Sequence, residues 1–269
     1  KSDSREPRVL TTYSRGLATA RDAWVYNYSR LALEQNVKRM IEFHNQQVDE
    51  ARVAREAGLA WNRNDDAGKI SWNRADESSL RRGKMLKFDS DRIRTSVYRP
   101  FSKQKVYFDR GLNDMVYQLD RAFPSAETDN WGFYLNGVHA TSEFAVLALD
   151  ALPCLDIYGK GGQFFPRYSF EQREHDGDLL SALDDDGTGY RRIDNITNEI
   201  LEDYQKTFGR EITKDGIFFY LYGILHSPDY REQFEGDLKK MLPRIPKVND
   251  FHAFSDAGRR LAKLHLGYE

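Results

Sequence analysis

The chain is poor in cysteine and has no long apolar segment. Cys154 is the single cysteine among 269 residues, so no disulfide can form within the chain, and a reducing cytoplasm is the expected location. No apolar run approaches the roughly 20 residues that cross a bilayer, and no signal-peptide pattern opens the chain, so we expect no membrane partner. The chain starts at Lys1 without a methionine, which suggests a fragment of a longer polypeptide.

The chain also lacks a large excess of charge of either sign. Its formal net charge is −2, unlike that of proteins that bind nucleic acid indiscriminately through phosphate neutralisation. The charges are nevertheless unevenly distributed. Ten basic and three acidic residues lie between Arg81 and Arg110, whereas seven acidic residues and one arginine lie between Glu171 and Asp186. Such blocks are either solvated faces or interaction surfaces, and composition alone leaves both interpretations open.

Signatures of catalysis and of cofactor binding are missing. Gly159-Lys160-Gly161-Gly162 resembles a phosphate-binding loop, but Gly161 stands where a P-loop has Ser or Thr, so a tight turn is the better interpretation. An adenine methyltransferase needs a glycine-rich S-adenosylmethionine loop and an Asn/Asp-Pro-Pro-aromatic motif, and neither occurs. No convincing nuclease motif lies on a predicted strand. We therefore expect no catalytic residue and no cofactor in this chain.

A resident metal ion is not expected either. Asp184-Asp185-Asp186-Gly187 suggests a calcium loop, but placing Gly187 at the sixth position puts Ala182 first and Ile193 twelfth, where ligands are needed. The six histidines show no metal-binding spacing, and one cysteine cannot build a structural zinc site.

The order of apolar patterns predicts an α+β fold: a long N-terminal helix, a mostly antiparallel β middle and a helical C-terminal bundle. We expect residues 1–22 to form a connecting arm and residues 23–269 to form one domain. Within this domain, the expected segments are a helical entry (23–88), a β-rich part (89–170), an acidic loop (171–194) and a helical part (195–269).

Individual elements follow from periodicity and from capping residues. Helices are predicted over 23–57, from a cap at Asp76 to about 87, over 196–208, 214–226 and 229–241, and over about 255–266. Asn195 and Thr213 are the expected caps of two of the C-terminal helices. Strands are predicted over 93–98, 105–108, 132–135, 144–149, 155–158 and 163–168. The pair Asn136-Gly137 between two apolar runs indicates a hairpin.

Two segments carry a resemblance to a known family. The first reads Ile93-Arg-Thr-Ser-Val-Tyr-Arg-Pro-Phe-Ser-Lys-Gln-Lys-Val-Tyr-Phe108 and continues through Asp109-Arg-Gly-Leu-Asn-Asp114. The second reads Tyr220-Leu-Tyr-Gly-Ile-Leu-His-Ser-Pro-Asp-Tyr-Arg231, followed by Leu242-Pro-Arg-Ile-Pro246. Together they resemble the C-terminal specificity domain of type ISP restriction–modification enzymes, and also fused methyltransferase–specificity chains of type IIG.

The resemblance implies a target-recognition domain that binds double-stranded DNA and is not itself an enzyme. In type ISP polypeptides, a nuclease, a helicase-type motor and an adenine methyltransferase precede this domain, so these modules are the partners that the resemblance implies. Two other functions stay open. The chain is alternatively a structural coupler between such modules without base readout, or a hydrolase whose active site has no recognisable motif.

Candidate DNA contacts follow from the basic segment and from side-chain chemistry. Arg99, Lys103 and Lys105 are candidates for phosphate contacts, and Arg92 and Arg94 are further basic candidates. Bidentate pairing makes Asn113 and Gln118 chemical candidates for adenine and Arg110 for guanine. The alternative for the Tyr98-Arg99-Pro100-Phe101 element is structural, with the two aromatic rings as core anchors and Arg99 in an ion pair.

Overall fold

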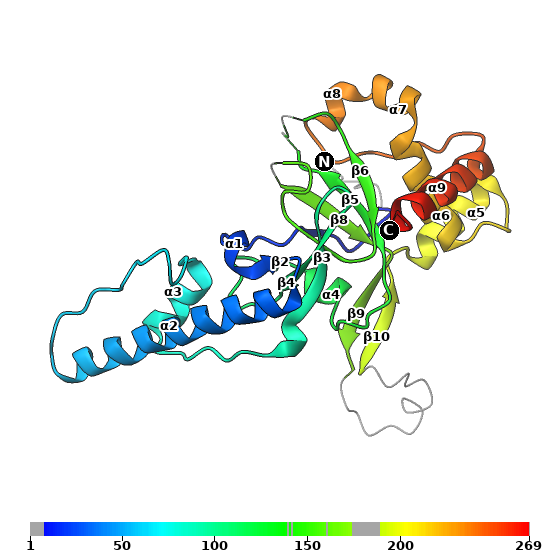
Figure 1. The fold of residues 1–269 in the computed structure, drawn as a ribbon. Coiled ribbons are helices and arrows are strands. Elements are labelled where there is room, and N and C mark those ends of the chain that lie inside the picture. Colours follow the sequence, from blue (N-terminus) through cyan, green and yellow to red (C-terminus); the bar gives the residue numbers. More distant parts are fainter. Residues whose placement is uncertain (1–7, 139, 141, 160, 174–188, 269) are drawn as a thin grey trace, which may run out of the picture. The chain divides into compact units, whose positions relative to one another are not determined.

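The computed structural model describes residues 8–138, 140, 142–159, 161–173 and 189–268 (Figure 1). The chain folds as two compact units. The N-terminal unit consists of residues 16–117 and 151–157, and the C-terminal unit consists of the described parts of segments 1–15, 118–150 and 158–269. Each unit combines stretches that are distant in the sequence. The contiguous segments predicted from the sequence do not include such an arrangement. The α+β class predicted from the sequence is confirmed.

A four-stranded sheet forms the centre of the N-terminal unit. Its order is β2 (Tyr26–Asn27), β4 (Ser102–Tyr107), β3 (Ile93–Arg99) and β7 (Leu152–Pro153). The first three strands are antiparallel, whereas β7 runs parallel to β3. Ser96 fixes this parallel pair, because its hydroxyl donates to the carbonyl of Leu152 at 2.7 Å. The strand predicted over 155–158 is wrong: pairing stops at Cys154, which bridges to Leu17, and a turn follows.

The long helix α2 (Arg30–Glu56) starts later than its periodicity predicts (Figure 1). Ser29 caps it by accepting a hydrogen bond from the backbone N–H of Ala32 at 3.3 Å. Residues 22–27 instead form the short helix α1 (Asp22–Val25) and strand β2, which pairs with β4. The predicted start at residue 23 is therefore wrong. Apolar residues keep their helical spacing on both sides of Ser29, so the spacing alone does not show that the helix begins at this capping serine.

Helix α3 (Arg74–Arg81) begins at a capping box. Asn73, rather than the predicted Asp76, is the capping residue, and the Asp76 carboxylate accepts from the backbone N–H of Asn73 at 2.9 Å. The same carboxylate forms an ion pair with Arg21 at 2.5 Å, and neither side chain is exposed to solvent. This buried pair holds the helix against the segment that precedes α1. A 3₁₀ turn, η1 (Ser90–Arg92), then leads into β3.

The C-terminal unit is built on a second, fully antiparallel sheet. Its order is β1 (Ser14–Arg15), β8 (Gly162–Pro166), β5 (Gly132–Asn136) and β6 (Val146–Leu149). Strand β1 lies within the predicted connecting arm, so that part of the arm is structured. The hairpin indicated by Asn136-Gly137 is confirmed as a pairing of β5 with β6. The connection between the two strands, residues 137–145, is longer than a two-residue turn. The side-chain amide of Asn136 bonds to its far end: it donates to Glu143 O at 2.7 Å and accepts from Ala145 N at 3.1 Å.

Side chains alternate across this second sheet, and one face is covered by helices. Phe133, Leu135, Val146 and Ala148 share a core with residues of α5, α6 and α9. Because neighbouring residues point to opposite faces, Phe164 lies on the other side, where its ring stacks on Phe123 beside the short helix α4 (Leu119–Ala122). The sheet therefore separates two apolar layers within this unit.

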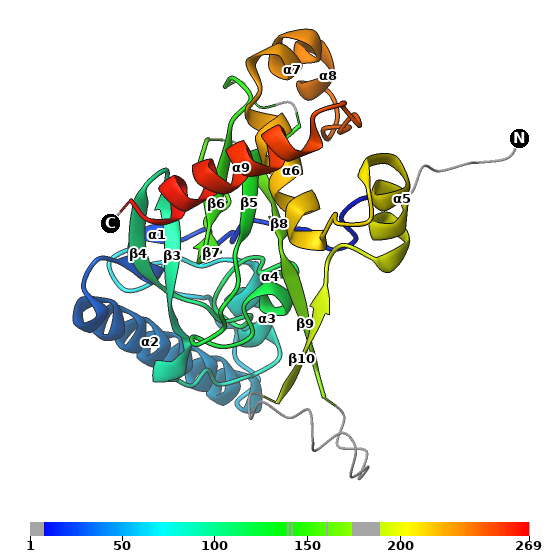
Figure 2. The same cartoon turned by 90° about the vertical axis from the view of Figure 1, so that its right-hand side faces the viewer.

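The helical part contains α5 (Asn198–Phe208), α6 (Lys214–His226), α7 (Pro228–Gln233), α8 (Glu235–Leu238) and α9 (Phe251–Leu266), and α9 crosses α6 (Figure 2). The helix predicted over 214–226 and its cap at Thr213 are confirmed. The cap of α5 is Thr197 instead of Asn195, whose buried amide donates to the carbonyls of Thr12 and Pro166. The single helix predicted over 229–241 is divided into α7 and α8 at Phe234.

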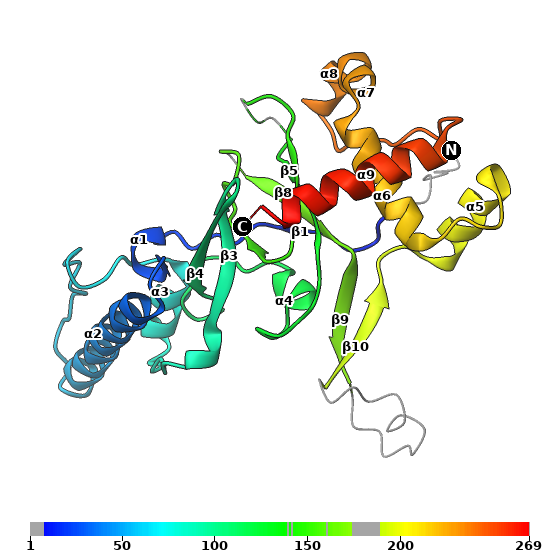
Figure 3. The same cartoon turned by 45° about the vertical axis from the view of Figure 1, so that its right-hand side comes forward.

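Strands β9 (Tyr168–Gln172) and β10 (Tyr190–Asp194) form a two-stranded antiparallel ribbon that extends from the C-terminal unit (Figure 3). Both ends of the predicted acidic loop, 171–172 and 190–194, therefore belong to strands. Residues 174–188, which include Asp184-Asp185-Asp186-Gly187, lie outside the described residues. Of the helices that the structure describes, none is both long and apolar enough to span a membrane.

Burial sets the protonation of His226 at the end of α6. Its Nδ1 lies 2.9 Å from the carbonyl oxygen of Tyr222, and its ring lies 4.5 Å from the ring of Tyr222. Burial, together with the positive charge of Arg231, lowers the pKa of His226 to about 4. The folded protein therefore keeps this imidazole neutral at pH values where the unfolded chain takes up a proton.

This difference predicts a loss of stability in acid. Because the folded pKa lies below the unfolded value of about 6.5, the unfolded state binds more protons as the pH falls below 6.5. The expected loss from this group between about pH 7 and pH 5 is about 2 kcal/mol. Urea unfolding of His226→Gln should show a pH dependence that is flatter by this amount. His252→Gln, which removes an exposed histidine of α9, is the control. Equal pH dependence in wild type and His226→Gln would contradict the prediction.

Candidate nucleic-acid interface

Lys103 and Lys105 lie on one face of the β3–β4 hairpin. In the antiparallel register, Lys103 faces Val97 and Lys105 faces Thr95, and these four positions share a face because they are two residues apart on each strand. The Lys105 ammonium donates to the Thr95 hydroxyl at 3.0 Å. Both lysines are half-buried. The hairpin thus presents two cations side by side, a spacing that suits consecutive phosphates of a nucleic acid.

The other basic candidates of this segment point elsewhere. Arg94 faces Val106 in the register, so it lies on the opposite side of the hairpin from the two lysines. Arg92, at the end of η1, forms ion pairs with Asp89 at 3.5 Å and with Asp109 at 3.8 Å. The basic residues proposed from the sequence as phosphate contacts therefore do not form a single face.

The Tyr98-Arg99-Pro100-Phe101 element forms the tight turn of this hairpin. Arg99 pairs with Ser102 across the ladder, which leaves Pro100 and Phe101 as the two turn residues. Phe101 has a backbone φ of 57°, a left-handed conformation that costs a non-glycine residue on the order of 1 kcal/mol. The Arg99 guanidinium lies over the Tyr98 ring at 4.0 Å and donates to the Tyr98 carbonyl at 2.7 Å.

These contacts favour a structural role for Arg99, but not the one predicted: its partners are the Tyr98 carbonyl and the Cys154 sulfur and not a carboxylate, and Phe101 is 49% exposed and therefore no core anchor. The guanidinium is held against its own strand, and its Nη1 also lies 3.6 Å from the sulfur of Cys154. The Tyr98 hydroxyl donates to Asp22 at 3.1 Å, which ties the hairpin to α1. Burial raises the pKa of the Cys154 thiol, so the thiol stays protonated at neutral pH.

The loop after β4 is shaped by two carbonyl-bearing side chains. Asp109 accepts from the backbone N–H of Gly111 at 2.6 Å, and the Asn113 oxygen accepts from the N–H of Asp109 at 2.8 Å. Asn113 is only 1% exposed, so it organises the loop and does not present its amide at the surface. Arg110 is exposed and donates to the carbonyl of Tyr117 at 3.1 Å.

Gln118 belongs to the C-terminal unit, whereas the other seven candidates belong to the N-terminal unit. Its side chain is exposed, and its backbone N–H donates to the Ser14 hydroxyl at 3.1 Å at the start of α4. The structure thus assigns the candidate DNA-contacting residues to different units and, on the hairpin, to different faces.

The second family-like segment is held together within the C-terminal unit. The hydroxyl of Tyr230 donates to the carbonyl of Arg244 at 2.9 Å, and that of Tyr220 donates to the carbonyl of Pro246 at 2.7 Å. Arg231 donates to the last turn of α6, at Leu225 O, at 2.7 Å. Side chains of residues 220–231 therefore fix the backbone of residues 242–246, which explains why the two stretches occur together in the motif.

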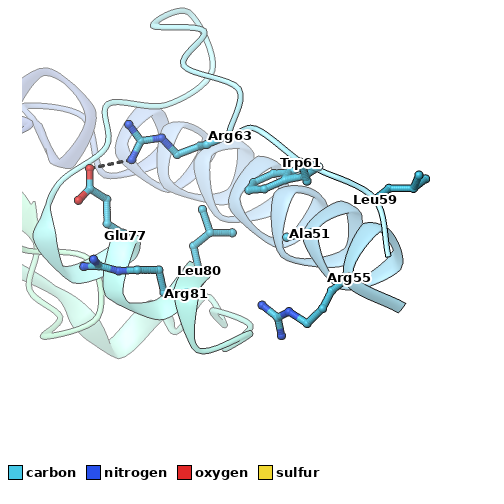
Figure 4. A pocket seen from close by; sticks show the side chains of 8 residues that line it. All are labelled: Ala51, Arg55, Leu59, Trp61, Arg63, Glu77, Leu80 and Arg81. Carbon is cyan, nitrogen blue, oxygen red and sulfur yellow. Dashed lines mark hydrogen bonds and ion pairs between the residues drawn. The ribbon is translucent and has the colours of Figure 1, made fainter. Parts of the chain in front are cut away.

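A cleft between α2, α3 and the segment that joins them was not predicted from the sequence (Figure 4). It has a volume of about 560 Å³, and its lining combines three arginines with apolar side chains and one carboxylate: Ala51, Arg55, Leu59, Trp61, Arg63, Glu77, Leu80 and Arg81. Arg81 belongs to the basic segment of the sequence, but nothing in the sequence pattern places Arg55 beside it.

Within the described ranges, no group of three or more His, Cys, Asp or Glu residues is arranged to hold a metal ion. The tight turn preferred for Gly159–Gly162 agrees with the left-handed backbone of Gly159 and Gly161, at φ values of 107° and 56°. Lys160 lies outside the described residues.

Comparisons with known proteins give one consistent result. A family model described as the Type ISP C-terminal specificity domain matches residues 8–269. The cryo-EM structure of a DrdV–DNA complex is 30% identical, with a TM-score of 0.82 over 99% of this chain and 25% of that one. No curated protein gives a significant match.

Two further solved structures are similar over the same extent. One is a nuclease-deletion mutant of the Type ISP restriction–modification enzyme LlaGI in complex with a DNA substrate mimic, at 29% identity and a TM-score of 0.81 over 99% of this chain and 23% of that one. The other is the ATP-dependent Type ISP enzyme LlaBIII bound to DNA, at 27% identity and a TM-score of 0.82 over 100% of this chain and 16% of that one.

The chain thus spans no more than a quarter of the length of these relatives. The family description names a specificity domain, which is a recognition domain and not a catalytic one. The expectation drawn from the two motif segments is confirmed: the chain belongs to the Type ISP C-terminal specificity domain family.

Proposed function

We propose that this chain recognises a specific sequence in duplex DNA and positions catalytic modules of a longer polypeptide on that target. The observation that carries the proposal is the family match over residues 8–269, together with the DNA complexes of relatives that are 27% to 30% identical. The modules in question are an adenine methyltransferase, a helicase-type motor and a nuclease. They enter the proposal because the resemblance to type ISP polypeptides implies them, and because this chain covers no more than 25% of each relative's length.

Candidate contacts divide by role. Lys103 and Lys105 share a face of the β3–β4 hairpin and are proposed to fix the register of the domain on the DNA backbone. Arg92 and Arg94 remain secondary phosphate candidates. Arg110 and Gln118 are exposed; the paired donors of Arg110 match guanine, and the amide donor and acceptor of Gln118 match adenine. The buried Asn113 is proposed to support the loop, and Arg99, whose guanidinium lies against Tyr98, is proposed to support the hairpin.

Selection from a random duplex pool tests this function. The chain is incubated with the pool at several salt concentrations, and the retained duplexes are sequenced. A sequence reader enriches one short motif at every salt concentration at which it binds. Salt-sensitive retention without enrichment would reduce the role of the chain to positioning. No retention would favour the structural coupler, the second function that the family context allows.

Charge reversal at the hairpin tests the phosphate contacts. Lys103→Glu combined with Lys105→Glu should weaken binding to every duplex, because phosphate contacts carry no sequence information. The plot of log binding constant against log salt concentration should lose about 2 units of slope, since each phosphate neutralised contributes about 0.9. The matched control reverses Lys240 and Lys263, two exposed lysines of the C-terminal unit. An unchanged slope would remove the hairpin face from the interface.

A further inference from the structure

The cleft between α2 and α3 combines positive charge with an apolar floor (Figure 4). Arg55 comes from the last turn of α2 and Arg81 from the last turn of α3, while Trp61 and Leu59 belong to the segment between these helices. Leu59 is 68% exposed, which is high for a large aliphatic side chain. The combination of guanidinium groups with exposed apolar atoms is typical of a surface that meets a partner.

Ion pairing leaves two of the three arginines without a counter-charge. Arg63 donates to Glu77 at 2.7 Å and to Asp65 at 2.6 Å, and its guanidinium lies 5.0 Å from the ring of Trp72. The one carboxylate that lines the cleft is thereby occupied. Arg55 and Arg81 are exposed and form no ion pair with any described residue. The cleft therefore has a net positive charge that no side chain of the described chain neutralises.

Helix dipoles explain only part of this arrangement. A cation in the last turn of a helix interacts favourably with the helix dipole, which accounts for an arginine at each helix end taken alone. It does not account for the meeting of two such arginines beside an indole, or for the exposed Arg82 and Lys84 that follow α3 directly. These residues extend the positive surface beyond the cleft, as a polyanion requires and a single small anion does not.

We propose that this cleft binds the sugar–phosphate backbone of duplex DNA. Arg55 and Arg81 donate hydrogen bonds to phosphate oxygens, and Trp61 and Leu59 contact the apolar face of the adjoining deoxyribose. The proposal rests on the DNA binding proposed above and deepens it, because it adds a second backbone contact on the helical part of the N-terminal unit. Contacts of this kind position a protein on DNA without reading its sequence.

The test uses Arg55→Gln combined with Arg81→Gln in the whole chain. The matched control is Arg210→Gln combined with Arg260→Gln, which removes the same charge from exposed positions of the C-terminal unit. Binding is measured by fluorescence anisotropy between about 50 and 200 mM salt. Two duplexes are compared, one with the selected motif and one with that motif scrambled. The cleft variant should lose between about 1 and 2 units of salt slope on both duplexes, since each lost phosphate contact removes about 0.9.

The outcomes separate this inference from the proposed function. A cleft variant whose slope equals that of the control overturns the cleft as a DNA contact, whatever the preference between duplexes. Equal affinity of the wild type for the two duplexes overturns sequence reading but leaves the cleft standing if its slope still falls. Absence of wild-type binding to either duplex overturns both. A loss of affinity in the cleft variant on one duplex alone would also count against a backbone contact.

Discussion

Replacing Gly258 with alanine should destabilise the protein by about 3 kcal/mol or more, although alanine is the better helix former by about 1 kcal/mol. Gly258 lies in the middle of α9, where this helix crosses α6 (Figure 2). A Cβ at this position would overlap the backbone carbonyl of Phe219 and lie 2.8 Å from the backbone nitrogen of Gly223. On α6, a Cβ at Gly223 would likewise overlap the carbonyl of Phe254.

Backbone atoms cannot turn aside as flexible side chains do, so the added methyl group must separate the two helices. Separation would open the core that α6 and α9 share with the sheet, including the side chain of Tyr222. The Tyr222 hydroxyl accepts from the backbone N–H of Ala148 on β6 at 2.8 Å, and this bond would stretch with the movement. Overpacking against an unyielding wall is one of the few causes of single-residue effects of this size.

The measurement is the urea midpoint of unfolding, and Gly236→Ala is the matched control. Gly236 lies in α8, and apart from its chain neighbours and its own helix backbone no atom lies within 4 Å of a Cβ placed there, so the same change should be neutral or slightly stabilising. Stability of Gly258→Ala equal to that of the wild type would mean that the two helices do not touch at this point.

The glycines of this crossing illustrate what the sequence can and cannot specify. Periodicity and the cap at Thr213 predict α6 from end to end, because both signals are local. The close approach of Gly223 to α9 is not local: it depends on a residue about 35 positions away, and no pattern within either helix announces it. Errors at helix starts have a different origin, because the signals there are local: Ser29 caps α2 although apolar spacing continues through it, and Asn73 caps α3 where Asp76 was the predicted cap.

The candidate interface shows a similar division. The sequence identifies the β3–β4 segment and its basic residues, but the faces of the hairpin depend on register, which places Lys103 and Lys105 together and Arg94 opposite. Asn113 has the right chemistry for adenine, yet its side chain is buried and accepts a hydrogen bond from the backbone N–H of Asp109. Only the fold shows this burial. Arg55 was not among the candidates because the packing of α2 and α3, not sequence proximity, brings it to Arg81.

Asp76→Ala should cost about 3–5 kcal/mol in the N-terminal unit, the expected effect of removing one partner of a fully buried ion pair. The variant would leave the Arg21 guanidinium charged within the protein, with Met40 Sδ at 3.3 Å from its Nη1 and no described partner for its Nε. Burial lowers the pKa of Arg21, but this group does not lose its proton at neutral pH. The variant also removes the Asp76 half of the α3 capping box.

A double-variant cycle separates the lone charge from the lost cap. Arg21→Met combined with Asp76→Ala removes both charges, so it should be more stable than Asp76→Ala alone by at least about 1 kcal/mol, because no unpaired ion remains inside. Asp49→Asn is the surface comparison: Asp49 pairs with Arg52 at 2.7 Å, the two side chains are 48% and 62% exposed, and this change should cost less than about 1 kcal/mol. If Asp76→Ala and Asp49→Asn cost the same, water must reach Arg21, and the ion pair beneath α3 cannot be the anchor of the helix that forms one wall of the cleft.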